Sequence, residues 1–305
     1  MHDENHHVAM QYKKKHRLRV AGMAVVLFLL FTWCYGYYVG RFRYHVHNQD
    51  ISFYDLPQEF DGYRIVHFSD LHVGSFSNGH EIEVQKIVDL IRQQKPDVVV
   101  FTGDIVNRTA DELKDYRHML SELSAPDGVY SILGNHDYGI YMRSFSEEQQ
   151  KAEKQKVVDH MREYGWTPLL NQNVAIQRGN AHIYIIGVEN QGYLKSYFPR
   201  HADMDKAMHG VGKQEFKVLL SHDPTHWRHD IVGKTNIQLT LSGHTHAGQF
   251  EMFGWSPVSF AYPEWKGIYV EDAQVLNISA GVGSLIPFRF GSSPEINVIT
   301  LHRVR

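Results

Sequence analysis

The chain has 305 residues, of which 43% are hydrophobic and 21% are charged, as in globular proteins and unlike disordered ones. Its single cysteine, Cys34, excludes a disulfide within the chain, and metal ions are expected to be held by oxygen and imidazole nitrogen. Residues 1–43 hold seven of the 31 basic and two of the 34 acidic residues, which leaves 24 basic and 32 acidic residues in the remainder. That acidic remainder argues against nucleic acid as a partner.

An uncharged stretch at 20–39 is long enough to cross a membrane as a helix. At a rise of 1.5 Å per residue its length is about 30 Å, the thickness of the hydrocarbon core of a bilayer. Aromatic residues gather toward its C-terminal end, as they do at membrane surfaces: Trp33, Tyr35, Tyr37 and Tyr38. We therefore expect a basic tail at 1–19 and a transmembrane signal anchor at 20–39.

The charges on either side of this stretch predict its orientation. Five basic residues precede it and two follow it, so the positive-inside bias places the N-terminus in the cytoplasm and the rest of the chain outside. A cleavable signal peptide is the alternative. A signal peptide usually has an apolar region of about 7–15 residues that ends at a small-residue cleavage site. The stretch at 20–39 is longer and no A-x-A site follows it, which favours an uncleaved anchor.

Residues 40–60 are expected to form a linker and a first strand. Beyond them, apolar runs predict strands at 63–68, 97–102 and 129–133, and helical spacing predicts helices at 81–92, 110–123 and 146–164. Short strands then dominate, at 181–188, 216–220, 237–241, 267–270, 275–279 and 296–301. This order predicts two sheets packed face to face with helices outside, an α/β sandwich in one domain at 61–305.

Polar clusters follow five of the predicted strands, where ligands gather in layered α/β folds. The clusters are Asp70-Leu71-His72, Gly103-Asp104, Gly134-Asn135-His136-Asp137, Ser221-His222-Asp223 and Gly243-His244-Thr245-His246. Each cluster alone would be an ordinary turn. Together they offer carboxylate, imidazole and amide oxygen, which are the ligands that hard and borderline dications prefer. The five clusters therefore predict a metal centre.

In this order the motifs resemble the signature of the calcineurin-like metallophosphoesterases, over roughly residues 60–302. The Ser-His-Asp-Pro and Gly-His-Thr-His-Ala-Gly-Gln forms are similar to those of the membrane-associated bacterial branch. The resemblance implies a four-layer α/β sandwich, with two packed mixed sheets flanked by helices, here preceded by one transmembrane helix. Together with the predicted anchor, it implies a single-pass protein of the bacterial inner (cell) membrane with an extracytoplasmic catalytic domain.

The resemblance also implies a role for each motif residue. The metal ligands that it implies are Asp70, His72 and His246 for one ion, Asn135, His222 and His244 for a second ion, and Asp104 for both. His136 would point at the substrate and Asp137 would orient His136. Two divalent ions are expected, and Mn, Fe, Zn or a mixed pair would suit these oxygen and nitrogen ligands.

The expected function is a membrane-anchored phosphoesterase that hydrolyses a phosphodiester or pyrophosphate bond with a metal-activated hydroxide. A lipid or polymer of the cell envelope is one candidate substrate, because the anchor holds the protein beside the bilayer. A phosphomonoesterase acting on phosphoproteins or small molecules is an alternative, and so is a non-catalytic metal-binding adaptor with the same fold. Because metal ligands must be neutral imidazoles, activity is expected to fall below about pH 6.

Two further features leave alternatives open. The segment 252–265 follows the last motif and carries six large apolar side chains: Met252, Phe253, Trp255, Phe260, Tyr262 and Trp265. A packed loop is the favoured interpretation, and an apolar lip that faces lipid or a lipid-like substrate is the alternative. Arg289, near the end of the chain, is expected to contact phosphate or to form a structural ion pair.

Overall fold

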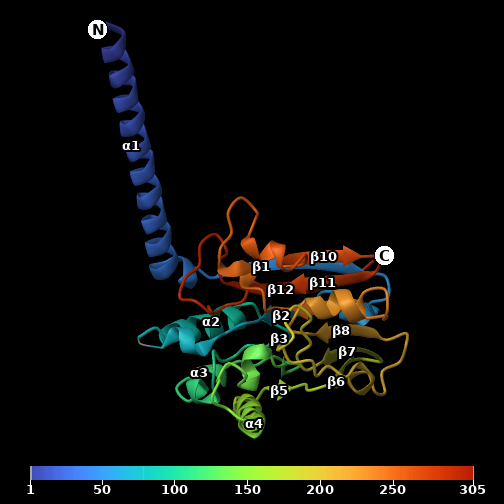
Figure 1. Ribbon diagram of the computed structural model, residues 1–305. Coiled ribbons are helices and arrows are strands. Elements are labelled where there is room, and N and C mark those ends of the chain that lie inside the picture. The colour runs from blue at the N-terminus through green and yellow to red at the C-terminus, as the bar shows by residue number, and fades with distance from the viewer. Residues whose placement is uncertain (1, 78, 305) are drawn as a thin grey trace.

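The computed structural model describes residues 2–77 and 79–304, which form two six-stranded sheets packed face to face below a long N-terminal helix (Figure 1). The first sheet consists, in spatial order, of β1 (His45–Phe53), β12 (Glu295–Arg303), β2 (Tyr63–Phe68), β3 (Val98–Phe101), β4 (Val129–Ser131) and β5 (Thr167–Pro168). The second consists of β10 (Gly267–Glu271), β11 (Gln274–Ile278), β9 (Leu239–Ser242), β8 (Phe216–Leu220), β7 (Ala181–Gly187) and β6 (Gln172–Arg178).

Both sheets are mixed. In the first, β2, β3, β4 and β5 run parallel, β12 is antiparallel to β2, and β1 is parallel to β12. In the second, β7, β8, β9 and β11 run parallel, and the edge strands β6 and β10 are antiparallel to their neighbours. Strand β1 lies within the range 40–60 that was predicted as a linker and first strand. The predicted domain boundaries themselves stay a prediction.

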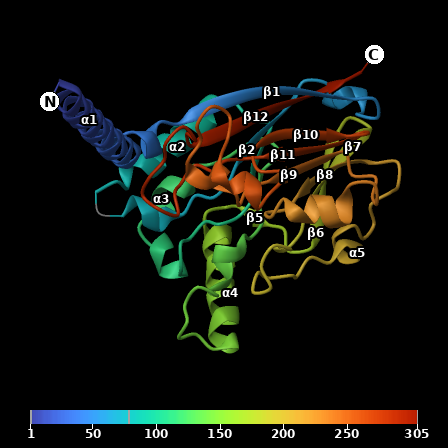
Figure 2. The ribbon, with the colours of Figure 1, turned by 45° about the horizontal axis from the view of Figure 1, so that its top comes forward.

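Helices cover the outer faces of both sheets (Figure 2). The α-helices are α1 (His2–Tyr38), α2 (Ile82–Gln93), α3 (Arg117–Leu120), α4 (Glu147–Glu163) and α5 (Met204–Ala207). Short helical turns complete the fold: η1 (Gly40–Phe42), η2 (Gln58–Phe60), η3 (Val73–Phe76), η4 (Ala110–Leu113), η5 (Asn135–Tyr138), η6 (Trp227–Ile231), η7 (His246–Gln249) and η8 (Pro257–Phe260). Helices α2, α3 and α4 pack on the first sheet, and α5 and η6 pack on the second. The predicted four-layer α/β sandwich is therefore confirmed.

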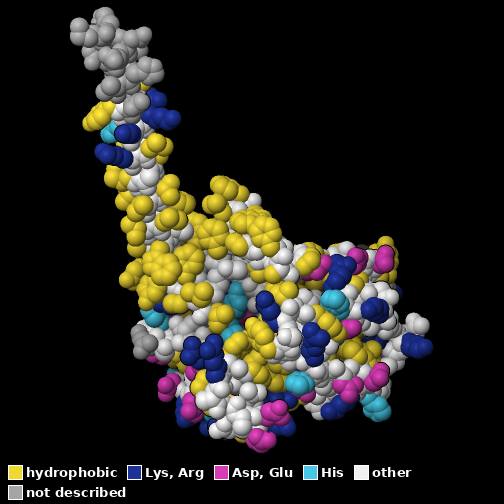
Figure 3. All heavy atoms as spheres, in the orientation of Figure 1, with side chains coloured by type: hydrophobic (Ala, Val, Ile, Leu, Met, Phe, Trp, Pro, Cys, Tyr) yellow, Lys and Arg dark blue, Asp and Glu magenta, His cyan; other side chains and the backbone are white. Residues whose placement is uncertain are grey.

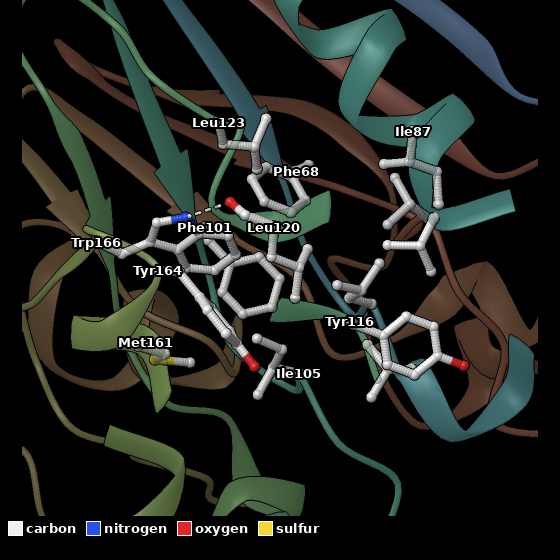
Figure 4. Packing of buried hydrophobic residues seen from close by; sticks show 14 of the residues in the cluster. Phe68, Ile87, Phe101, Ile105, Tyr116, Leu120, Leu123, Met161, Tyr164 and Trp166 are labelled. Carbon is white, nitrogen blue, oxygen red and sulfur yellow. Dashed lines mark hydrogen bonds between the residues drawn. The ribbon is translucent and has the colours of Figure 1, made fainter. Parts of the chain in front are cut away.

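Successive side chains of a strand point to opposite faces of the sheet, so apolar side chains fill both the space between the two sheets and the space beneath the helices. In β3, Val98 and Val100 point between the two sheets, whereas Val99 and Phe101 point toward the helices, as the two-residue period of a strand requires. On the helical side, Phe101 and Phe68 pack with Trp166, whose indole N–H donates to the carbonyl of Leu120 at 3.2 Å (Figure 4). This packing holds the ends of β2 and β3 at a fixed separation.

Helix α1 extends away from the sandwich and leaves most of its apolar side chains exposed (Figure 1). Among the described residues it is the one helix that is long and apolar enough to cross a membrane, judged by length and composition. Its C-terminal end contacts the domain through Trp33, whose ring stacks on Phe288 with a centroid separation of 5.6 Å. Helix α1 is therefore joined to the domain by packing as well as by the chain.

The predicted helix at 110–123 is wrong in part, because the chain forms the 3-10 turn η4 and then the short helix α3. The carboxylate of Glu112 accepts hydrogen bonds from the backbone N–H groups of Asn107, Arg108 and Thr109, which favours a tight turn at this point. Turn residues 114–116 then separate η4 from α3. Leu113 and Leu120 still reach the same core, which explains the helical spacing of the sequence.

Candidate metal centre

Loops that follow five strands bring the predicted site residues together at one edge of the sandwich. Strands β2, β3 and β4 are parallel in the first sheet, and β8 and β9 are parallel in the second, so each set sends its loops to one edge. These loops carry Asp70, His72, Asp104, Asn135, His136, Asp137, His222, His244 and His246. Seven of these residues, all but Asn135 and Asp137, form three overlapping groups, and in each group the carboxylate oxygens and ring nitrogens lie within 4.8 Å of one another.

The first group consists of Asp70, His72 and His246, all of which are buried. Nε2 of His246 lies 3.1 Å from Nε2 of His72 and 3.3 Å from Oδ1 of Asp70. Two ring nitrogens and a carboxylate oxygen thus converge on one point in the interior. Buried charges are normally paired or coordinate metals, and this donor set suits a borderline dication.

The second group consists of Asp104, His222 and His244. Nε2 of His222 lies 3.2 Å from Oδ2 of Asp104, and Nδ1 of His244 lies 3.3 Å from Nε2 of His222. The same Oδ2 atom of Asp104 lies 3.6 Å from Nε2 of His72, which belongs to the first group. The Asp104 carboxylate is therefore the link between the two groups.

Asn135 provides an independent sign of a ligand position. Its side-chain amide Nδ2 donates to the hydroxyl of Tyr141 at 2.7 Å. Its Oδ1 is buried and has no hydrogen-bond partner among the described residues. Because buried polar atoms are nearly always paired, this free amide oxygen fits a metal ion as its partner.

Contacts on the far side of two of these histidine rings fix their orientation. Nδ1 of His222 donates to the backbone carbonyl of Thr102 at 2.7 Å, which directs Nε2 toward Asp104. Nε2 of His244 lies 2.7 Å from the hydroxyl of Tyr262, which directs Nδ1 toward His222. Such partners of the second ring nitrogen are typical of metal-binding histidines.

The backbone at the candidate ligand positions is strained. Asp70, His72, Asp104, His244 and His246 have φ values of 52°, 44°, 61°, 74° and 51°, in the left-handed region that residues other than glycine rarely adopt. Such conformations cost about 1–3 kcal/mol each and cluster at functional sites. Neighbouring glycines make room for these side chains, since a Cβ on Gly134 would lie 2.2 Å from Oδ1 of Asp104. The backbone of these loops therefore places the side chains at the site at a cost in local stability.

The electrostatics of the buried groups favour cation binding. Burial lowers the pKa of His72 to about 3, and it also lowers the pKa of His244 and His246, so these rings are neutral and free to act as ligands. His222 differs: burial works against its charged form, yet the Asp104 carboxylate raises its pKa to about 10. Burial likewise opposes ionisation of Asp104, but His222 and His136 hold the pKa of this carboxyl well below its usual range. A cation between Asp104 and His222 would take the place of their shared proton.

His136 lies beside the two groups and its ring faces the pocket. Nδ1 donates to the backbone carbonyl of Asn107 at 2.7 Å, and the ring stacks on Tyr141 with a centroid separation of 4.1 Å. Nε2 is therefore the ring nitrogen left to act on a ligand. The ring also lies near His72 and Asp104, with which it forms a third group of donor atoms.

Asp137 contacts the backbone of the ligand loops. Its carboxylate accepts hydrogen bonds from the N–H groups of Asp104 at 2.9 Å, Ile105 at 3.0 Å, Val106 at 3.3 Å and Gly134 at 2.9 Å. These bonds tie the loop after β3 to the loop after β4. The expected orienting effect on His136 stays a prediction, and the observed contacts would act on it through the backbone.

A pocket of about 930 Å³ opens above the two groups. Asp104, Asn135, His136, His244 and His246 line its floor on the metal side. Its walls carry the cations Arg108 and Arg143 and the apolar or aromatic side chains Tyr141, Met142, Tyr197, Phe198 and Leu285. The size is that of pockets that hold small-molecule ligands, so the pocket can hold more than a phosphate ion.

Several of these residues were missed in the sequence. Arg108 follows the Gly103-Asp104 motif, and Tyr141 and Arg143 follow the motif at 134–137, but none of the three belongs to a motif. Only the fold brings them to the pocket. Tyr262 was noted as an apolar side chain, whereas the structure buries it with its hydroxyl against His244. Arg289 is fully buried, and its guanidinium donates to the carbonyls of Ala280, Gly283 and Ser292. Its role is therefore to hold the loop 280–292 beside His246.

Several known proteins are similar to this chain in sequence. The chain is 29% identical over 261 residues to the uncharacterized metallophosphoesterase YkuE of Bacillus subtilis, with 81% of each chain covered. It is 28% identical over 240 residues to an uncharacterized metallophosphoesterase of Aquifex aeolicus, covering 78% of this chain and 84% of that one. It is also 28% identical over 253 residues to a transmembrane protein with metallophosphoesterase domain of Danio rerio, covering 81% of this chain and 54% of the relative.

Solved structures with a similar arrangement include TT1561 of Thermus thermophilus, with 16% identity, a TM-score of 0.43, and 72% of this chain and 90% of that chain covered. A dimetal phosphatase from Danio rerio has 14% identity and a TM-score of 0.41, with 74% of this chain and 90% of that chain covered. The sequence profile described as calcineurin-like phosphoesterase matches residues 63–248, which include the five motif loops. The chain belongs to the calcineurin-like phosphoesterase family.

Proposed function

We propose that this protein is a membrane-anchored phosphoesterase with two metal ions that hydrolyses a phosphodiester or pyrophosphate bond. The observation that carries the proposal is the position of Asp104. Its Oδ2 lies 3.6 Å from Nε2 of His72 in one donor group and 3.2 Å from Nε2 of His222 in the other. A carboxylate placed between two groups can hold two ions close together, as hydrolysis of phosphoesters by two metals requires.

The donor atoms divide naturally between two ions. Asp70, His72 and His246 would hold one, and the second would be held by Asn135, His222 and His244, with Asp104 shared. Oxygen and imidazole ligands suit Mn, Fe, Zn or a mixed pair. When bound, the ions supply positive charge that activates water for attack and offsets the charge that builds up on the phosphoryl group.

His136 would serve the leaving group. Its Nδ1 hydrogen is engaged by the carbonyl of Asn107, which leaves Nε2 as the atom that can carry a proton toward the pocket. A protonated Nε2 would donate to the leaving oxygen as the P–O bond breaks, which is general-acid catalysis. Asp137 would support this step through the loop backbone, because it accepts hydrogen bonds from the N–H groups on either side of the site.

The residues that line the pocket favour a substrate whose phosphorus carries a second ester or phosphate group. The pocket of about 930 Å³ leaves room beyond the metal-binding floor, and Arg108 and Arg143 line that room. Guanidinium groups bind phosphate well, so they would hold the second phosphate of a pyrophosphate or the far side of a diester. This supports a diester or pyrophosphate over a phosphomonoester, which needs no such extension.

Helix α1 supports the anchoring part of the proposal. It is long and apolar enough to cross a bilayer, and the basic residues before the apolar stretch outnumber those after it, which favours an extracytoplasmic catalytic domain. Relatives from Danio rerio and Bos taurus are named as transmembrane proteins. Our proposal is a single-pass protein of a bacterial inner membrane, with residues 61–305 as the catalytic domain and a substrate that can be lipid-linked.

A substrate panel on metal-reconstituted, full-length protein tests the proposal. We expect turnover of a diester such as bis(p-nitrophenyl) phosphate and of a pyrophosphate, with little turnover of p-nitrophenyl phosphate. Asp104→Ala serves as the inactive control. Preference for the monoester would instead indicate a phosphomonoesterase. Metal binding without hydrolysis of any substrate would indicate a non-catalytic adaptor.

A further inference from the structure

Two loops next to α1 expose large apolar side chains. Phe253 is 99% exposed, Phe260 85% and Ile286 58%. Together with Met252, Trp255 and Leu285 we call these residues the apolar loop pair; they come from the segments 252–260 and 285–286. Figure 3 shows hydrophobic side chains that continue from the lower half of α1 onto the adjoining face of the domain. Soluble proteins rarely expose clustered aromatic side chains unless the surface meets an apolar partner.

The position of the loop pair relative to α1 is fixed by direct contacts. The backbone N–H of Arg289 donates to the carbonyl of Gly36 at 3.1 Å, and Phe288 stacks on Trp33. The approach is so close that a Cβ on Gly36 would lie 2.3 Å from the ring of Phe288. The segment 285–290 is therefore attached to the apolar stretch of α1 itself, as well as to Gly40 just beyond it.

The second loop is attached to the first. The N–H of Glu251 donates to the carbonyl of Phe290 at 2.8 Å, and that of Phe290 donates to the carbonyl of Gln249 at 3.0 Å. The side-chain amide of Gln249 also donates to the carbonyl of Ile286 at 2.6 Å. At its outer end Trp255 packs edge-on against Phe260, with ring centroids 5.7 Å apart. The two loops are thus one ordered unit on the side of α1.

The contact between Trp33 and Phe288 places the two loops at the same depth in a bilayer as the apolar stretch of α1. Trp33 precedes Val39, the last residue of the uncharged stretch, by six residues. At a rise of 1.5 Å per residue the Trp33–Phe288 contact lies about 9 Å inside the end of that stretch. A bilayer that surrounds residues 20–39 must therefore meet the loops as well. The segment 252–263 contains no Asp, Glu, Lys or Arg that would oppose such contact.

We infer that the apolar loop pair is a second membrane contact, which inserts into the same leaflet as the C-terminal part of α1. The inference rests on the proposed anchoring by α1. Two apolar attachments at different points hold the domain in one orientation on the bilayer, whereas a single helix would leave it free to tilt. Tryptophan and phenylalanine are suited to this interfacial depth.

The orientation has a consequence for the substrate. Leu285 belongs to the loop pair and also lines the pocket above the metal centre, so the pocket opens beside the membrane contact. A phosphoester on an amphiphilic molecule could reach Asp104 and His136 while its apolar chain stays among Leu285, Tyr197 and Phe198. The substrate class that fits this arrangement is a phosphodiester or pyrophosphate carried by a membrane lipid.

Depth-dependent quenching tests the contact directly. The full-length chain, one copy per lipid nanodisc, carries one cysteine labelled with an environment-sensitive fluorophore, and brominated phospholipids quench any label inside the bilayer. Three positions are compared: native Cys34 in α1, Phe253→Cys, and Ala152→Cys on the exposed face of α4, which Figure 1 places at the far end of the domain. The last two carry Cys34→Ser.

We expect Cys34 and Phe253→Cys to be quenched several-fold more strongly than Ala152→Cys. Quenching at Cys34 without quenching at Phe253→Cys would overturn the inference and leave the anchor intact. Protection of Phe253→Cys from a water-soluble quencher without bromolipid quenching would mean that a protein covers the loops, which also overturns it. Absence of quenching at Cys34 would refute the anchor and the inference together.

Activity supplies a second readout. The variant Phe253→Ser/Phe260→Ser should lose at least fivefold in turnover of a vesicle-borne lipid pyrophosphate and keep its turnover of bis(p-nitrophenyl) phosphate. Tyr54→Ser, at an 81% exposed aromatic residue outside the loop pair, is the matched control and should change neither rate. Equal losses on both substrates would show that the loops support only the fold, and an unchanged lipid rate would contradict the inference.

Discussion

The hydroxyl of Tyr262 lies 2.7 Å from Nε2 of His244, and this contact joins the apolar loop after the last motif to the candidate metal centre. The opposite ring nitrogen, Nδ1, faces His222 at 3.3 Å. The tyrosine therefore determines which nitrogen of His244 is presented to a metal. Burial raises the pKa of Tyr262 well above the usual range of tyrosine, so the hydroxyl stays neutral near His244.

Replacing this hydroxyl should weaken the second metal position. Tyr262→Phe removes the partner of His244 Nε2, and loss of such a partner typically lowers metal affinity about 10–100-fold. Titration of the metal-free protein with Mn²⁺ should show one weakened ion and one unchanged ion. Tyr54→Phe, at an exposed tyrosine, is the control. Two unchanged affinities would show that Tyr262 is only a packing residue.

His136 is expected to act on the leaving group and not as a metal ligand. His136→Gln should keep the metal content and lower kcat about 10²–10⁴-fold, the usual contribution of a general acid. The loss should be larger for an alkyl leaving group, which needs a proton, than for p-nitrophenolate, which does not. Metal content and kcat on the two substrates check this, and a variant that loses metal would place His136 among the ligands instead.

A buried histidine behind the site predicts how stability depends on pH. His67 lies in β2 with its Nε2 2.9 Å from the hydroxyl of Thr102, and burial lowers its pKa to about 3. In the unfolded chain the ring takes up a proton near pH 6.5. The unfolded state therefore binds one more proton between about pH 6.5 and 3, and the free energy of unfolding falls with acid by about 1.4 kcal/mol per pH unit.

The variant His67→Gln removes this contribution. Denaturant unfolding at several pH values should show a shallower loss of stability below pH 6.5 than in the parent protein. His118→Gln, at an exposed histidine of α3, is the matched control and should leave the slope as it is. Parallel curves for the parent and His67→Gln would contradict the assignment.

Much of the fold follows from apolar periodicity. Strands β2 and β8 lie where the sequence predicts them, because their runs are buried on both faces of a sheet. Strand β6 was missed, since at the edge of the second sheet it buries Ile176 alone, and Ala175 and Gln177 on either side are exposed. The helix predicted at 110–123 was wrong because hydrogen bonds from the preceding loop to Glu112 decide the turn, and periodicity does not report them.

Part of the candidate site could likewise be predicted from the sequence, and part could not. The motif residues can be found in the sequence because each follows a strand, and parallel strands carry their loops to one edge. Tyr141, Tyr262 and Arg143 could not be found, because their place depends on the path of long loops through space. The segment 252–265 is neither a packed loop nor an exposed apolar lip over its whole length. Tyr262 packs against the site, and Phe253 is exposed.

Metal content measured beside activity tests the central claim most directly. Full-length protein should bind two ions per chain, lose hydrolysis of bis(p-nitrophenyl) phosphate on chelation and regain it with Mn²⁺. Because its carboxylate lies between both donor groups, Asp104→Ala should lose both ions, whereas Asn135→Ala should keep one. Hydrolysis that persists without metal, or an Asp104→Ala variant that still holds two ions, would contradict the account.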